Sequence, residues 1–336
     1  MKNNYRDLKV SRIISEAINI EMELDEKILV FGEDVGKLGG VFATTIGLQK
    51  KFGEKRVRDM PISELAFTGM GVGLSMMGYR PIIEIMFADF IGVCFEQIIH
   101  SMSKIPYMSG GKVKIPMVIK TAAGCIGSAA QHSQCLWATF AHFPGMYVVA
   151  PSNPYDYKGL LAASIQSDNP TIFIEHKSHM HKRVSNFILN QEVPEKRYIT
   201  KIGKAKIVKE GSDLTIVTLS AQVEYSLVVA NKLQSNNIDI EVIDLISIVP
   251  MDIETICSSV SKTKRLLVID EDYLSFGLSG EIITRVIEHL GINNLKQIER
   301  LGNPDVPVPA AKSLEKLTIP NVSSIENKII HMSKSF

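Results

Sequence analysis

Cysteine and tryptophan are scarce in this sequence, and its charges almost cancel. The 336 residues include four cysteines, without a CxxC pair, and one tryptophan. This argues against a disulfide framework or a zinc site of paired cysteines, and it fits a reducing compartment. Lysine plus arginine number 37 and aspartate plus glutamate 36, a formal net charge of +1. Without a basic surplus, nucleic acid is not an expected partner.

Long hydrophobic runs are also missing. The longest helical candidate without a charge is Leu65–Tyr79, which is shorter than the roughly 20 residues of a membrane span. Residues 1–16 carry charges of both signs and no apolar core of signal-peptide length. From these features we expect a cytoplasmic protein without a membrane partner.

Several common catalytic motifs are absent from the sequence. There is no GxxxxGK followed by Ser or Thr, no GxGxxG after a strand, no HExxH and no GxSxG. Nucleotide triphosphate hydrolysis, dinucleotide binding, zinc proteolysis and α/β-hydrolase chemistry therefore lose their usual support.

One further absence is local. The 35 residues from Thr121 to Tyr155 contain no Asp, Glu, Lys or Arg, although 22% of the chain is charged. The stretch is not simply apolar, because it includes Gln131, His132, Ser133 and Gln134. Neutral polar groups in an uncharged setting are typical of a site lining or a buried interface.

Short β-branched runs alternate with helical patterns throughout the sequence. This alternation predicts an α/β fold of two parallel-sheet domains. We expect a first domain over 1–185, a polar linker over 186–200 and a second domain over 201–336. The expected strands of both domains are Lys27–Phe31, Pro81–Met86, Ile115–Lys120, Met146–Ala150, Thr171–Glu175, Asp213–Leu219, Asp239–Asp244 and Arg265–Asp270.

Glu64 is the first candidate functional residue. It follows Asp59–Ser63, a strand exit and turn, and it opens an apolar helix. One interpretation is an acid in the first helical turn, stabilised by the helix dipole, with Ser63 as the cap. The other is a desolvated carboxylate of raised pKa, suited to hydrogen-bonding or protonating a ring nitrogen.

His132 is the second candidate. It lies inside the uncharged stretch, where it is either a hydrogen-bonded structural group or a proton-transfer group whose pKa a modest local change could move through neutrality. His176, His179 and His181 also cluster, but without regular metal-ligand spacing, so a solvated loop is expected there.

The sequence resembles the beta subunits of the thiamine-diphosphate-dependent first component of 2-oxo acid dehydrogenase complexes, a transketolase-like family with pyruvate, acetoin and branched-chain members. Eight segments carry the resemblance in order along nearly the whole chain: GEDVG at Gly32–Gly36, GGVF at Gly39–Phe42, DMPISE at Asp59–Glu64, YMSGGK at Tyr107–Lys112, AAQHSQ at Ala129–Gln134, PSNPYDYKGLL at Pro151–Leu161, GKAKIVKEGSDLTIV at Gly203–Val217 and VIDL at Val242–Leu245. The implied fold is a pyrimidine-binding domain followed by a transketolase C-terminal-like domain.

The resemblance assigns roles to four residues. Glu64 would hydrogen-bond N1′ of the cofactor's aminopyrimidine ring, and Ile62 and Phe90 would pack against that ring. His132 would act in proton transfer during handover of the acyl group to a lipoyl arm. The catalytic residues implied are thus Glu64 and His132.

The resemblance also implies a bound potassium ion. The sequence differs from the family pattern at two other positions. The ion would be held largely by main-chain oxygens at Met117, Ser164, Ile165, Ser167 and Asn169, with Ser167 standing where an aspartate is often found. Lys120 stands where the family usually has arginine, and Ile246 follows VIDL where arginine is usual.

The GDG…NN pattern that binds magnesium and diphosphate in thiamine enzymes is absent from the chain. The resemblance explains this absence, because an alpha subunit holds the Mg²⁺ and diphosphate and the cofactor is shared. We therefore expect a catalytic beta subunit in a heterotetramer of two alpha and two beta chains, which passes acyl groups to a lipoylated dihydrolipoyl acyltransferase core. Pyruvate is the first expectation for the substrate, with acetoin or a branched-chain 2-oxo acid as alternatives.

Two other classes of function stay open from the sequence. One is a non-catalytic assembly subunit that only docks the acyltransferase core. The other is a self-sufficient transketolase-like enzyme that binds thiamine diphosphate and magnesium by itself.

Overall fold

The computed structural model describes residues 6–334, and its contacts divide the chain into two compact α/β units. The first unit comprises the residues up to Ala123 together with Phe140–Ile202. The second comprises Gly124–Thr139 together with the residues from Gly203 onward. The middle of the uncharged stretch therefore belongs to the second unit.

A parallel sheet forms the centre of the first unit, with six of its strands in the order β5-β6-β4-β3-β1-β2. Every residue of β1, β4 and β6 is buried, as expected for strands covered on both faces. The strands are β1 (Ile28–Gly32), β2 (Val57–Asp59), β3 (Arg80–Ile85), β4 (Val118–Ala123), β5 (Tyr147–Val149) and β6 (Thr171–His176).

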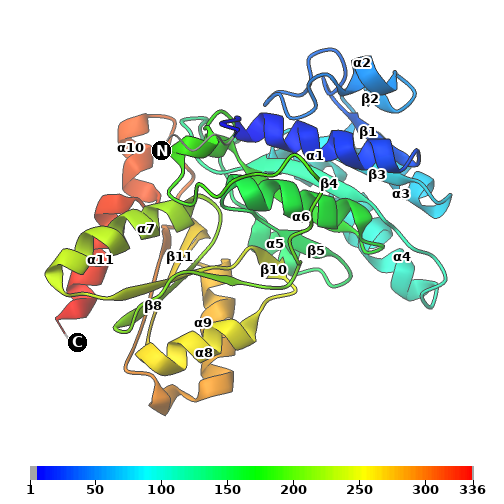
Figure 1. Cartoon of the computed structure of the whole chain (residues 1–336). Coiled ribbons are helices and arrows are strands. Elements are labelled where there is room, and N and C mark those ends of the chain that lie inside the picture. Colours follow the sequence, from blue (N-terminus) through cyan, green and yellow to red (C-terminus); the bar gives the residue numbers. More distant parts are fainter. Residues whose placement is uncertain (1–5, 335–336) are drawn as a thin grey trace. The chain divides into compact units, whose positions relative to one another are not determined.

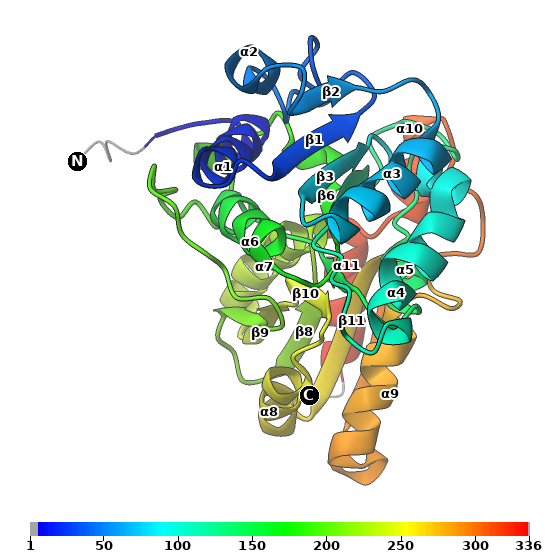
Figure 2. The ribbon, with the colours of Figure 1, turned by 90° about the vertical axis from the view of Figure 1, so that its right-hand side faces the viewer.

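Helices cover both faces of this sheet. Figure 2 shows α1 and α6, which pack on one another, on one side of β1 and β3, and α3 and α4 on the other side. The helices of this unit are α1 (Val10–Leu24), α2 (Leu48–Phe52), α3 (Glu64–Met76), α4 (Ser103–Met108) and α6 (Pro154–Gln166), with a 3₁₀ helix, η1, at Ala88–Cys94; α5 (Trp137–Ala141) begins in the second unit and ends in the first.

The second unit contains a five-stranded sheet in the order β12-β11-β8-β9-β7, parallel except for the edge strand β7. In Figure 1, α7 and α11 lie on one side of β8 and β11, and α8 and α9 on the other. The elements are β7 (Lys206–Lys209), β8 (Leu214–Thr218), β9 (Ile240–Asp244), β10 (Ser247–Val249), β11 (Arg265–Tyr273), β12 (Gln297–Asn303), α7 (Ala221–Leu233), α8 (Ile253–Thr263), α9 (Leu278–Leu290), α10 (Lys312–Thr318) and α11 (Val322–Ser333).

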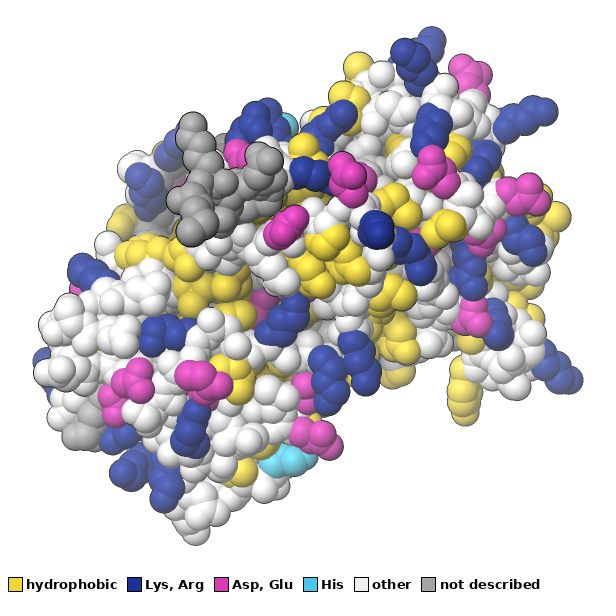
Figure 3. Space-filling view, in the orientation of Figure 1, with side chains coloured by type: hydrophobic (Ala, Val, Ile, Leu, Met, Phe, Trp, Pro, Cys, Tyr) yellow, Lys and Arg dark blue, Asp and Glu magenta, His cyan; other side chains and the backbone are white. Residues whose placement is uncertain are grey.

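The mixed surface charge and the hydrophobicity of the helices agree with the near-zero net charge and the lack of long apolar runs in the sequence. Basic and acidic side chains are interspersed over the face shown in Figure 3. Within residues 6–334, no helix is long and apolar enough to cross a membrane.

A buried ion network crosses the middle of the first sheet. The Lys120 ammonium on β4 lies 2.8 Å from Glu84 Oε2 on β3 and 3.2 Å from Glu175 Oε1 on β6, and it donates to Thr44 Oγ1 at 2.9 Å. All four side chains are at most 4% exposed. One ammonium thus serves two carboxylates, so the network carries a net negative charge when both are ionised.

This network predicts a pH-dependent stability. Burial raises the pKa of Glu175 to about 7, with Lys120 opposing the shift and Glu84 adding to it. Because the folded-state pKa lies above the unfolded value, the stabilisation is full below about pH 4.5 and is lost as the pH rises through about 7, with a slope of up to about 1.4 kcal/mol per pH unit. Denaturant unfolding between pH 4.5 and 7.5 should show this slope in the wild type and a shallower one in Glu175→Gln. Identical slopes would contradict the assignment.

Candidate functional site

A pocket of about 740 Å³ lies where three neighbouring parallel strands end. Strands β2, β1 and β3 are adjacent in the sheet, and the residues just beyond their carboxyl ends line the pocket. Open α/β sheets commonly bind ligands at this edge. The lining residues are Glu33, Asp34, Asp59, Met60, Pro61, Ile62, Glu64, Met86, Phe90 and Val93.

The loop before α3 is fixed to the end of β1. The Met60 amide donates to the Gly32 carbonyl at 2.9 Å, and Asp59 Oδ1 accepts from the Gly36 amide at 2.6 Å. A Cβ atom on Gly36 would lie 2.6 Å from Asp59 Oδ2, so a larger residue here would displace this carboxylate. The loop therefore presents its remaining side chains to the pocket from a defined backbone.

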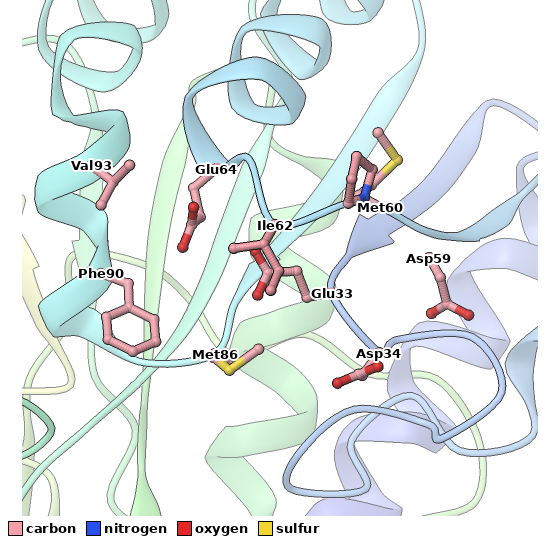
Figure 4. A pocket seen from close by; sticks show the side chains of 10 residues that line it. Glu33, Asp34, Asp59, Met60, Ile62, Glu64, Met86, Phe90 and Val93 are labelled. Carbon is pink, nitrogen blue, oxygen red and sulfur yellow. The ribbon is translucent and has the colours of Figure 1, made fainter.

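Glu64 is the first residue of α3 and is 9% exposed. Ser63 occupies the N-cap position, but its side chain makes no capping hydrogen bond, so the expectation of a serine cap was wrong. In Figure 4 the Glu64 carboxylate faces the same space as Phe90 and Ile62. The structure thus brings together the three residues that the sequence assigned to the cofactor ring.

The apolar wall of the pocket is formed by residues of contrasting exposure. Ile62 is 86% exposed on the loop before α3. Phe90 on η1 makes an edge contact with Phe87, with ring centroids 5.4 Å apart, and the Lys177 ammonium lies 5.3 Å from the centroid of Phe87. Phe90 is thus held by packing, while Ile62 is free to cover a ligand.

Glu33 is a candidate that sequence reasoning missed. Its Oε1 atom is buried and has no hydrogen-bond partner among the described residues. Burial raises the pKa of Glu33, and the charges of Glu64 and Asp34 raise it further. The signal was present in the sequence, because Glu33 directly follows the buried strand β1 within GEDVG.

His132 belongs to the second unit, whereas every residue that lines the pocket belongs to the first. It is half-buried on the segment Gly124–Thr139, and its amide donates to the Ala129 carbonyl at 3.4 Å. Ala129 has a φ of +62°, so the backbone turns sharply just before His132.

The five residues of the predicted potassium site all belong to the first unit, just before β4 and around the carboxyl end of α6. Met117 precedes β4, and its carbonyl accepts from the Thr171 amide at 2.9 Å. Ser164 and Ile165 end α6, and Ser167 and Asn169 follow that helix. The Arg80 guanidinium donates to the carbonyls of Ile165 at 3.2 Å and Ser167 at 3.0 Å. A cationic side chain therefore already contacts two of the five positions.

Two other sequence expectations concern the histidine cluster after β6 and Ile246. A solvated loop was expected for His176, His179 and His181; it was wrong for His176 and His179, each 3% exposed, whereas His181 is exposed. The Tyr157 hydroxyl lies 3.1 Å from His179 Nδ1 and accepts from the His176 amide. Ile246, where the family pattern has arginine, is fully buried in a left-handed conformation with φ +57°.

Comparison with known proteins matches two successive parts of the chain to two families. "Transketolase, pyrimidine binding domain" matches residues 6–182, and "Transketolase, C-terminal domain" matches residues 203–325. A solved structure described as "Split gene transketolase, inactive beta4 tetramer" matches with a TM-score of 0.76 over 98% of this chain and 99% of that chain, at 21% identity. The predicted fold class is confirmed.

Three relatives match over nearly their whole lengths. The pyruvate dehydrogenase E1 component subunit beta of Rickettsia felis is 41% identical, over 95% of this chain and 96% of its own. The 2-oxoisovalerate dehydrogenase subunit beta of Bacillus subtilis is 39% identical, over 93% and 94%. The acetoin:2,6-dichlorophenolindophenol oxidoreductase subunit beta of Cupriavidus necator is 40% identical, over 95% and 96%.

The chain belongs to the family of 2-oxo acid dehydrogenase beta subunits. It is therefore a component of a thiamine-diphosphate-dependent enzyme and works with an alpha subunit. Because the pyruvate, branched-chain and acetoin relatives are equally similar within two percentage points, identity does not distinguish their substrates.

Proposed function

We propose that this beta subunit provides the pyrimidine-binding half of a thiamine diphosphate site in a pyruvate dehydrogenase, with Glu64 hydrogen-bonded to N1′ of the aminopyrimidine ring. The observation that carries the proposal is the pocket, where the nearly buried Glu64 carboxylate adjoins the apolar side chains of Ile62, Met86 and Phe90. A ring with apolar faces and a basic nitrogen at its edge suits these surroundings.

The same pocket is unsuited to a diphosphate. Four of its ten lining residues are acidic, and none is Lys or Arg. Anionic phosphates require basic groups, a helix N-terminus or a bound cation. The N-terminus of α3 at this pocket carries the Glu64 carboxylate, which would repel a phosphate. We infer that the alpha subunit holds the diphosphate and Mg²⁺, which agrees with the missing GDG…NN pattern.

Within this half-site, each residue has a separate task. Glu64 holds a proton at N1′, while Phe90 and Ile62 pack against the ring and exclude water. When bound, thiamine diphosphate supplies the carbon nucleophile and the electron sink for decarboxylation of a 2-oxo acid. Burial and the nearby charge of Glu64 both raise the pKa of Glu33, which lines the same edge of the pocket.

The second unit would act after decarboxylation. We propose that His132 transfers a proton during handover of the acyl group to a lipoyl arm of the acyltransferase core, in a complex of two alpha and two beta chains. Support comes from its half-buried position on a segment without charged residues, where an imidazole can exchange a proton with a bound group.

Turnover of the complex with its alpha subunit tests the proposed function. Pyruvate, acetoin and a branched-chain 2-oxo acid should be compared side by side, and we expect the highest kcat/KM for pyruvate. A higher value for either of the others would reassign the substrate. Core docking without thiamine-dependent turnover of any substrate would instead favour a non-catalytic assembly subunit.

Potassium binding at Met117, Ser164, Ile165, Ser167 and Asn169 stays a prediction, with its own test. Carbonyl oxygens have two lone pairs, so those bonded to Arg80 can still accept a second partner. A ligand that binds only the native state should raise Tm, here by about 2–4 °C in KCl relative to tetramethylammonium chloride of equal ionic strength. Equal Tm values would mean that Arg80 alone serves these oxygens.

A further inference from the structure

Three consecutive carboxylates near the carboxyl end of β11 are buried in the second unit. Asp270, Glu271 and Asp272 are 1%, 3% and 6% exposed. Buried carboxylates require hydrogen-bond donors, because desolvation of an unpartnered charge is costly. The segments that supply these donors are the ones that the three carboxylates hold in place.

Donors come from both ends of the segment that carries His132. At its start, the Cys125 amide donates to Glu271 Oε1 at 2.9 Å. At its end, the Trp137 indole Nε1–H donates to Asp270 Oδ1 at 2.9 Å, and the Ala138 amide bonds the Asp272 carboxylate. Both ends of the segment are therefore hydrogen-bonded to the same three acidic residues, which close it into a loop.

Two more contacts fix the interior of this loop. The Cys125 thiol donates to the carbonyl of Ser133 at 3.4 Å, which ties the residue next to His132 to the anchored end. The Gly127 amide donates to Glu315 Oε2 on α10 at 2.8 Å. Four carboxylates thus hold one loop that contains no charged residue of its own.

Charge and burial agree with this arrangement. Burial raises the pKa of both Asp270 and Asp272, whereas the hydrogen bonds from Trp137 and Ala138 favour their ionised forms. An acidic residue in the loop would be repelled by the cluster. The absence of Asp and Glu from Gly124–Thr139 agrees with this contact.

We propose that Asp270, Glu271 and Asp272 are positioning residues that hold the His132 loop in the geometry needed for acyl transfer. The inference rests on the proposed function, because the role of His132 in that step comes from it. Glu271 is the most important of the three, because it also accepts a hydrogen bond from the Gln222 side chain at 3.3 Å. It therefore links the loop to helix α7.

Glu271→Ala in the complex with the alpha subunit is the test. We expect acylation of a free lipoyl domain to fall on the order of 100-fold, because a small misplacement can cost that much. Decarboxylation measured with an artificial oxidant should stay near wild type. Amide hydrogen exchange over residues 125–138 should accelerate. Glu271→Gln keeps an oxygen that can accept from the Cys125 amide and should restore both acylation and protection.

Glu281→Ala is the matched control, because this side chain is 54% exposed and pairs with Arg285 one turn along the same helix. It should change neither exchange nor acylation. If Glu271→Ala does not fold, Trp137→Phe removes one anchor and should give a smaller effect of the same kind. Faster exchange with unchanged acylation, or unchanged exchange in a folded Glu271→Ala, would overturn the proposal. An inactive wild-type complex would contradict the proposed function. The exchange data would still show whether Glu271 anchors the loop.

Discussion

Glu64→Gln, assembled with the alpha subunit, should lower thiamine-dependent turnover by roughly 10²–10⁴-fold, the usual contribution of a positioned acid–base group. The amide has nearly the shape of the carboxylate but cannot give or take the N1′ proton. Because Glu64 begins α3 in the pocket between apolar walls, water is a poor substitute for it. Steady-state kcat with saturating cofactor and substrate measures the loss.

Glu54→Gln provides the control for this result. Glu54 is an exposed glutamate of the same unit and does not line the pocket, so its amide variant should match the wild type. The Tm of both variants should also match the wild type, which would separate a chemical loss from misfolding. Undiminished turnover in Glu64→Gln would sink the role assigned to this residue.

Lys120→Met should destabilise the first unit by about 3–5 kcal/mol, the cost of breaking a buried ion pair from one side. Methionine has a similar length but leaves Glu84 and Glu175 facing each other without a cation. The free energy of unfolding in denaturant, measured at pH 7.5, should show the loss. At pH 5 the loss should shrink, because Glu175, with its pKa near 7, is then protonated in the folded state.

Two companion variants sharpen this prediction. Lys120→Arg restores the residue that the family resemblance implies at this position, and it should keep most of the stability because a guanidinium can serve both carboxylates. Lys120→Met combined with Glu175→Gln should recover part of the loss. A change below about 1 kcal/mol in Lys120→Met would show that the network contributes little.

The sequence predicted the buried strands well, because their apolar side chains are enough to identify them. β8 and β9 lie within one residue of their predicted bounds at both ends. β7 was missed because Lys206 and Lys209 make this antiparallel edge strand look like a loop. β4 begins at Val118, three residues later than predicted, because Pro116 lacks the amide that a central strand must donate.

The candidate site could be predicted only in part. The family resemblance pointed to Glu64, Ile62 and Phe90, and all three line the pocket. The contact of the uncharged stretch with Asp270 and Glu271 could not be foreseen, since those residues lie more than 130 positions along the chain. Pairings at that distance depend on tertiary packing, which local pattern does not encode.

Calorimetry with thiamine diphosphate and Mg²⁺ tests most directly the claim that this chain provides half of a shared site. The isolated beta chain, with an acidic pocket and no Lys or Arg in its lining, should show no measurable binding. The complex with the alpha subunit should bind one cofactor per alpha–beta pair, and Glu64→Gln should weaken that binding. Tight binding of thiamine diphosphate with Mg²⁺ by the beta chain alone would contradict the account and indicate a self-sufficient enzyme.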